Sequence, residues 1–145
     1  MIKEFHNLDE IQKYYDKESN TYIFKEYGTY INLIVFNFDL NVKSNIEAWN
    51  IYGKNINAYN INAKSIKADD IVANDNIKAW DISAKNIKAN NIEAWNICAD
   101  DISYLAVCFA IHNIECKSIE GRIENAKHFV LDGHIYIDGT IETTK

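Results

Sequence analysis

A five-residue repeat in the middle of the chain constrains its fold more than any other feature. Between residues 45 and 103, Ile recurs every five positions, with one extra residue between Ile71 and Ile77. A small residue, nearly always Ala, follows every repeated Ile except Ile102 by two positions, and Asn, Asp or Ser precedes each Ile. The repeated isoleucines are Ile46, Ile51, Ile56, Ile61, Ile66, Ile71, Ile77, Ile82, Ile87, Ile92, Ile97 and Ile102.

This period predicts a β-solenoid. Five residues fit neither a 3.6-residue helix nor simple strand alternation. Ile and Ala two positions apart point to the same side of an extended segment. The polar residue before Ile suits a corner, because Asn and Asp tolerate unusual backbone angles and hydrogen-bond their own main chain. The absence of Pro is consistent, since every coil must hydrogen-bond to its neighbours.

The N-I-x-A-x repeat resembles that of the pentapeptide-repeat proteins. The resemblance implies an all-β, right-handed β-helix with four sides and twenty residues in each coil. This chain departs from the family pattern because its small residue follows the large one by two instead of preceding it. The family covers many functions, so the resemblance predicts a fold and little chemistry.

Both flanks of the repeat are expected to cap the solenoid. We predict a small α+β cap over residues 1–44, with a helix over about 8–18 and a hairpin around Tyr27 and Gly28. The solenoid is expected over 45–126, and a β cap with Asp-Gly turns over 127–145. Beyond Ile102 the pattern shifts by two, which places Tyr104 and Phe109 in the Ile position.

The charge and cysteine content exclude several classes of protein. The net charge of −6 disfavours direct nucleic-acid binding. The three Cys have no CxxC spacing, which indicates reduced thiols and a cytoplasmic protein. No apolar run reaches the length of a membrane span, and no basic-then-apolar leader pattern opens the chain.

The sequence carries no recognisable catalytic machinery. Phosphate-binding glycine loops, zinc-protease motifs and hydrolase elbows are all missing, and the four His are scattered. We therefore expect no enzyme activity, no catalytic residues, no metal site and no cofactor.

The leading interpretation is a non-catalytic protein-binding solenoid. Several of the pentapeptide-repeat proteins that this chain resembles are similar to DNA in shape and charge and block DNA-binding machinery. The resemblance therefore implies a gyrase-like enzyme or a CRISPR effector as the partner, with a phage or mobile-element origin. Residues 45–103 hold 8 acids against 6 bases. DNA as long as four coils would carry about eleven charges, so mimicry would have to use one acidic edge. The expected partner-binding residues are Asp69, Asp70, Asp81, Asp100, Asp101, Trp49, Tyr59, Trp80 and Trp95.

Two alternatives stay open. In the first, the chain is a structural or self-assembly module, such as a homodimer, with Trp and Tyr at the subunit contact. In the second, four lysines that stack under a twenty-residue coil form a basic edge that touches phosphate; these are Lys64, Lys67, Lys85 and Lys88.

Overall fold

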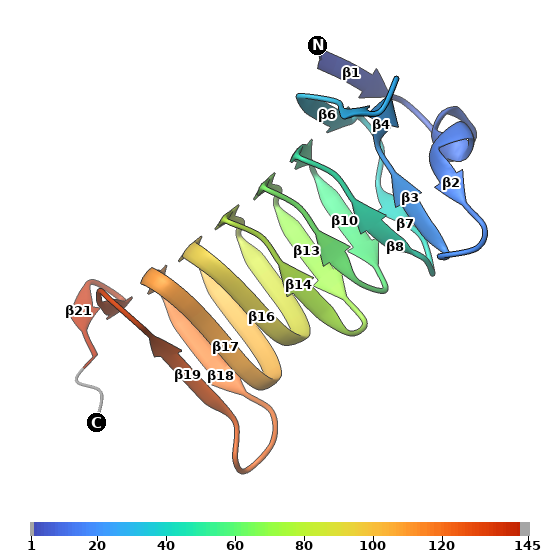
Figure 1. Ribbon diagram of the computed structural model, residues 1–145. Coiled ribbons are helices and arrows are strands. Elements are labelled where there is room, and N and C mark those ends of the chain that lie inside the picture. The colour runs from blue at the N-terminus through green and yellow to red at the C-terminus, as the bar shows by residue number, and fades with distance from the viewer. Residues whose placement is uncertain (1, 143–145) are drawn as a thin grey trace.

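The computed structural model describes residues 2–142, and their strands wind around one axis as a β-helix (Figure 1). Successive coils stack from the N-terminal end to the C-terminal end, and strands of neighbouring coils pair in parallel. Residue 1 and residues 143–145, at the outer ends of the two expected caps, lie outside the described residues. The all-β solenoid predicted from the repeat is confirmed.

Each regular coil has three faces and takes fifteen or sixteen residues. Ile66 pairs with Ile51, fifteen residues earlier, and with Ile82, sixteen residues later. The expected four-sided coil of twenty residues, with four edges, is therefore wrong. A period of five divides both fifteen and twenty, so the repeat sets the length of a side and not the number of sides. The register of the hydrogen bonds between coils sets that number.

The first face is the longest stack, and its inward ladder runs from Ile34 to Ile135. Its strands are β1 (Ile2–Phe5), β6 (Leu33–Phe36), β9 (Asn50–Gly53), β12 (Ser65–Lys67), β15 (Asp81–Ser83), the last parts of β16 (Asn86–Cys98) and β17 (Asp101–Cys116), and β20 (Ile135–Ile137).

The second and third faces complete each coil, and β16 and β17 each run around all three faces. The second face contains β7 (Leu40–Asn41), β10 (Asn55–Ala58), β13 (Asp70–Ala73), the first parts of β16 and β17, and β18 (Ser118–Gly121). The third face contains β3 (Thr21–Ile23), β8 (Asn45–Glu47), β11 (Ile61–Asn62), β14 (Asn76–Lys78), the middle parts of β16 and β17, and β19 (Lys127–Val130).

The interior of the coils is filled by the repeated Ile and the small residue that follows it. All twelve repeated isoleucines are at most 2% exposed. Full burial of one such side chain contributes about 1.5–3 kcal/mol. Asn side chains tie the corners together: the Asn60 Nδ2 donates to Asn45 at 3.0 Å, and the Asn91 Nδ2 donates to Asn76 at 2.9 Å. Stacking therefore uses apolar ladders inside and amide ladders at the corners.

The coils begin earlier in the chain than the repeat does. β3 pairs with β8, and β6 pairs with β9, so residues 21–36 already lie on the third and first faces. Between them, β4 (Lys25–Glu26) and β5 (Thr29–Tyr30) form a short antiparallel hairpin. Its turn residues Tyr27 and Gly28 have positive φ angles of 54° and 79°, as the expected turn requires.

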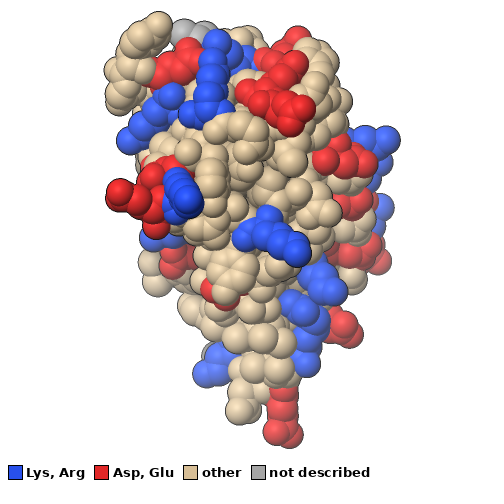
Figure 2. All heavy atoms as spheres, turned by 90° about the vertical axis from the view of Figure 1, so that its right-hand side faces the viewer, with Lys and Arg blue, Asp and Glu red and all other residues tan. Residues whose placement is uncertain are grey.

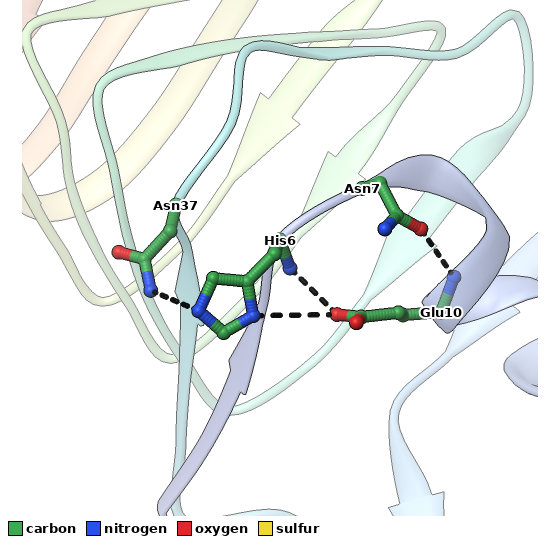
Figure 3. A network of polar contacts seen from close by, with 4 residues as sticks. All are labelled: His6, Asn7, Glu10 and Asn37. Carbon is green, nitrogen blue, oxygen red and sulfur yellow. Dashed lines mark hydrogen bonds and ion pairs between the residues drawn. The ribbon is translucent and has the colours of Figure 1, made fainter.

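The expected N-terminal helix is a shorter 3₁₀ helix, η1 (Leu8–Tyr14), followed by β2 (Tyr15–Asp16), which pairs with β3. A 3₁₀ helix repeats every three residues. Ile11 and Tyr14 are therefore buried together, whereas Tyr15, which would share a face with Ile11 in an α-helix, is exposed. A polar network at its start joins it to the first face (Figure 3). The Asn7 side chain caps the Glu10 N–H at 3.2 Å, and His6 lies between Glu10 and Asn37.

Toward the C-terminal end the coils become longer and less regular. The partner of Ile97 is Ile114, seventeen residues later, and the partner of Ile114 is Ile135, twenty-one later. Phe109, expected in the inward position, points outward, and Cys108 and Ala110 are buried instead. One extra residue at the corner after the buried Tyr104 shifts the inward positions by one. β20 ends in a tight hairpin to β21 (Thr140–Ile141), with a turn at Asp138 and Gly139.

Candidate functional site: the aromatic edge

One edge of the β-helix carries a continuous ladder of aromatic and cationic side chains. It lies where the third face turns into the first face. We call it the aromatic edge, and it consists of Tyr30, Trp49, Lys64, Trp80, Trp95 and His112. Backbone hydrogen bonds join its central residues from coil to coil, because the N–H groups of Lys64, Trp80 and Trp95 each donate to the carbonyl of the edge residue one coil earlier. These distances are 2.6 Å from Lys64 to Trp49, 2.8 Å from Trp80 to Lys64 and 2.7 Å from Trp95 to Trp80.

The best-ordered contact of this edge is the stacked pair Trp80 and Trp95. Their ring centroids are 4.8 Å apart and their planes differ by 8°. The centroid separation equals the usual spacing of neighbouring strands. His112 contacts Trp95 at 5.9 Å with its ring at 86°. Trp49, Trp80 and Trp95 are between 39% and 49% exposed, so their outer rims reach solvent while their faces are covered.

Lys64 interrupts the ladder between two rings. Its Nζ lies 5.3 Å from the centroid of Trp49 on one side and 5.3 Å from that of Trp80 on the other. Both distances fall within the range of a cation–π contact. Lys64 forms no ion pair with any residue in the range 2–142. The ammonium is therefore held by aromatic faces and not by a carboxylate.

The N-terminal end of the edge is held by a tyrosine. Tyr30 stacks on Trp49 at 5.8 Å, and the Nζ of Lys25 lies 4.5 Å from the centroid of Tyr30. The Tyr30 hydroxyl donates a hydrogen bond to the Glu47 carboxylate. This bond, together with burial, raises the pKa of Tyr30 to about 12. The phenol therefore stays protonated at neutral pH and fixes Glu47 beside the edge.

Two grooves run along the third-face side of the edge. The first has a volume of about 430 Å³ and is lined by Tyr30, Glu47, Ala48, Trp49, Asn62, Ala63, Lys64 and Trp80. The second, of about 260 Å³, lies beside Trp80 and Trp95 and reaches Phe109 and Ile111. Lys78 and Glu93 form an ion pair at 3.5 Å across the second groove's rim. The grooves thus combine aromatic walls with a polar border.

The acidic residues expected to bind a partner do not form an acidic row. Asp69 and Asp100 lie on the edge between the first and second faces, where successive coils place Lys54, Asp69, Lys85, Asp100 and Lys117. We call this the charged edge. Lys117 and Asp100 lie 3.8 Å apart. The face seen in Figure 2 likewise carries Lys, Arg, Asp and Glu interspersed, with no large area of one sign.

The other three acids already serve as acceptors between coils. Asp70 accepts a hydrogen bond from Asn86 at 2.7 Å, Asp81 from Asn96 at 3.0 Å and Asp101 from Ser118 at 2.6 Å. Asp70 and Asp101 adjoin the charged edge, whereas Asp81 adjoins the aromatic edge. Tyr59 lies apart from all of them on the edge between the second and third faces, where its N–H bonds to Ser44.

The expected basic edge is also dispersed by the three-sided coil. Lys64 belongs to the aromatic edge and Lys85 to the charged edge. Lys67 and Lys88 point outward from the first and second faces. Lys67 lies 5.7 Å from the ring of Tyr52. The structure therefore does not bring these four lysines together.

The described residues show no arrangement typical of metal chemistry. Within residues 2–142, no group of three or more His, Cys, Asp or Glu is placed to hold a metal ion. Over the same range no helix combines the length and apolar character of a membrane span. Cys108 and Cys116 are buried among the coils and Cys98 is exposed. Burial raises the pKa of the Cys108 thiol to about 12, so this thiol stays protonated.

Comparison with models of known protein families, with characterised proteins and with solved structures finds no match. The site therefore rests on its own geometry. Sequence reasoning selected Trp49, Trp80 and Trp95, but the twenty-residue coil on which it relied would place them on different edges. It also missed the roles of Tyr30 and Lys64. The spacing of the tryptophans, thirty-one and then fifteen residues, was the available signal, because it equals two coils and one coil.

Proposed function

We propose that this chain is a non-catalytic binding protein whose partner, another protein, docks along the aromatic edge. The observation that carries the proposal is the exposed row of three tryptophans beside two grooves. Exposed Trp side chains are costly in water, and Trp and Tyr are enriched among the residues that dominate protein interfaces. Aromatic anchors with a polar border are the usual anatomy of such an interface.

The dimensions of the edge also suit a protein partner. From Tyr30 to His112 the ladder spans five steps between coils, or about 24 Å at the usual strand spacing. A standard interface of about 800 Å² per partner has a similar width. Because Trp80 and Trp95 cover each other's faces, they offer their rims and the adjacent grooves. This geometry favours a shaped protein surface over a flat ring that would need a free aromatic face.

The charged edge offers less support for DNA mimicry. A row of phosphates has one sign, whereas this edge alternates Lys and Asp from coil to coil. Neighbouring opposite charges cancel at distances beyond a few ångströms, so a DNA-binding enzyme would meet little net field. We therefore place the recognition surface on the aromatic edge, and a DNA-binding enzyme is only one of the proteins that could dock there.

Photo-crosslinking in cells tests this proposal. A photoreactive amino acid replaces His112 on the aromatic edge or, as a matched control, Tyr59 on another edge. We expect a discrete conjugate from position 112 that is lost when Trp80→Ala is added, and no such conjugate from position 59. Conjugates of equal yield from both positions, or none from position 112, would contradict the proposal. A conjugate of twice the chain mass would identify a second copy as the partner.

Salt dependence separates aromatic docking from electrostatic mimicry. The binding of a purified type II topoisomerase or CRISPR effector is measured at low salt and at about 0.5 M salt, where charges are screened beyond a few ångströms. Docking through the aromatic edge predicts binding that survives high salt and falls with Trp95→Ala. Binding that disappears at high salt and is unchanged by Trp95→Ala would instead support mimicry by the acidic residues.

A further inference from the structure

We infer that the gap between Trp49 and Trp80 is a binding site for an alkylated ammonium group, which Lys64 fills in the free protein. We call this gap the Lys64 slot. The inference goes beyond the proposed function, since it names a cationic ligand that the slot takes with or without a docked protein. It rests on the spacing of the two rings, on the way Lys64 is held and on the groove beside it.

The spacing of the slot is set by the coils. Trp49 and Trp80 lie two coils apart, so their backbones are separated by about 9.6 Å at the usual strand spacing. A cation midway lies about 4.8 Å from each ring, which is within the cation–π range of about 6 Å. The observed distances of 5.3 Å from the Lys64 Nζ to both rings agree with this geometry. The slot already holds an ammonium between two aromatic faces, and this occupant points to a cationic ligand.

The side chain that occupies the slot is free to leave it. Lys64 is exposed, forms no ion pair within residues 2–142 and contributes to the ladder through its backbone, whose N–H and carbonyl bond to Trp49 and Trp80. These backbone bonds keep the rungs in place when the side chain moves out. The strong hydration of a primary ammonium further favours its release into water.

The groove beside the slot supplies the remaining features of a cation site. Its volume of about 430 Å³ leaves room for the substituents of an alkylated ammonium. Tyr30 and Glu47 close one end, and the hydrogen bond between them holds the carboxylate on the groove wall. Aromatic faces with a nearby carboxylate are the usual environment of a bound quaternary ammonium, whose weak hydration makes it a better occupant than Lys64.

The next rungs of the ladder do not offer the same site. Trp80 and Trp95 stack at 4.8 Å, and Tyr30 and Trp49 stack at 5.8 Å, so no cation fits between the rings of either pair. The slot exists only where a non-aromatic residue separates two tryptophans by two coils. The inference therefore predicts one such site on this edge.

Titration with tetramethylammonium, followed by Trp fluorescence, tests the inference. Wild-type protein is compared with Lys64→Ala, which empties the slot, and with Lys85→Ala, the same change on the charged edge. We expect Lys64→Ala to bind about tenfold more tightly than wild type, because the internal competitor has gone. Lys85→Ala should bind as wild type does. Adding Trp49→Ala to Lys64→Ala should abolish the gain.

Two further comparisons of ligands define the chemistry of the ligand and its source. Choline is compared with its neutral isostere 3,3-dimethylbutan-1-ol, and only the cation should bind the Lys64→Ala protein. A short peptide carrying trimethyl-lysine is compared with free tetramethylammonium. Tighter binding of the peptide assigns the ligand to a protein, and equal binding assigns it to a small molecule.

The inference is overturned if Lys64→Ala binds tetramethylammonium no more tightly than wild type, or binds the neutral isostere as well as choline. Circular dichroism of each variant verifies that the β-helix is intact, and Lys64→Arg, which keeps a cation in the slot, should bind as wild type does. If position 112 gives no crosslink in the otherwise unchanged protein, the protein-docking proposal is rejected and this titration is unaffected.

Discussion

The interior ladder and the aromatic edge belong to the same coils and obey different rules. Ile82 is 2% exposed inside its coil, whereas Trp80, two residues earlier, is 49% exposed on the edge. Both are held by the same backbone register. The interior repeats Ile and a small residue in every regular coil, while the edge changes from Trp to Lys and back to Trp. The interior positions therefore accept few residue types, whereas the edge positions can vary and can supply the residues that bind a partner.

The two kinds of position differ because an inward side chain is enclosed by its neighbours and an edge side chain is not. An inward side chain has to fill a closed space beside identical neighbours, so a change in its volume leaves a cavity or a clash. An edge side chain contacts only the residues one coil above and below, with solvent on its outer side. The backbone hydrogen bonds between coils form whatever the side chain is, since Lys64 makes the same backbone bonds as the aromatic residues of this edge. Substitutions should therefore cost most inside the coils, less on the aromatic edge and least on the charged edge.

Ile82→Ala should destabilise the protein most. The change leaves a cavity in a filled interior, and such substitutions cost about 2–5 kcal/mol in the free energy of unfolding. Urea denaturation followed by far-UV circular dichroism measures the loss. Ile82→Val is the matched control and should cost about 0.5–1.5 kcal/mol. Equal and small losses in both variants would contradict a closely packed interior.

Trp80→Ala should have an intermediate effect on stability and a specific effect on the spectrum. It removes the stack on Trp95 and the contact with Lys64, for a combined cost of about 1–2 kcal/mol. Two indoles stacked at 4.8 Å should also give a coupled circular dichroism signal. We expect this signal to disappear in Trp80→Ala and in Trp95→Ala and to persist in Trp49→Ala. Loss of the signal in Trp49→Ala would contradict the three-sided coil.

Asp100→Asn should change stability least. Its ion pair with Lys117, at 3.8 Å, joins side chains that are 48% and 70% exposed, and solvent and salt screen such pairs. We expect a change below about 0.5 kcal/mol, and no change in the crosslink from position 112. A loss above about 1 kcal/mol would show that the charged edge supports the coils as the interior does.

The sequence predicted the elements that depend on local pattern. The twelve repeated isoleucines point inward, Asn residues lie at the corners, and the turns at Tyr27-Gly28 and Asp138-Gly139 form where their residues favour positive φ. Each of these follows from a few neighbouring residues. Cys116 likewise fills a small inward position, as its place in the pattern indicates.

The sequence did not predict which side chains share an edge, because that depends on which residues lie one coil apart. A twenty-residue coil would separate Trp80 from Trp95 and would place Asp100 and Asp101 near Tyr59. In the observed shorter coil Trp80 stacks on Trp95, and the two aspartates lie on a different edge from Tyr59. The same holds for Phe109, whose outward position depends on one extra residue at the corner after Tyr104. No single repeat contains that information, because it concerns which repeat lies opposite which.

The amino-acid pattern alone therefore dictates coils with Ile and Ala inside and Asn at the corners, because a five-residue period leaves no other way to bury one side of every extended segment. The closure of each coil by three sides emerges only in the folded molecule, because interior volume and hydrogen-bond register act between segments that lie one coil apart in the chain. That closure places Trp49, Lys64 and Trp80 on one edge. The candidate site is thus a product of the coil length, and not of any motif within the repeat.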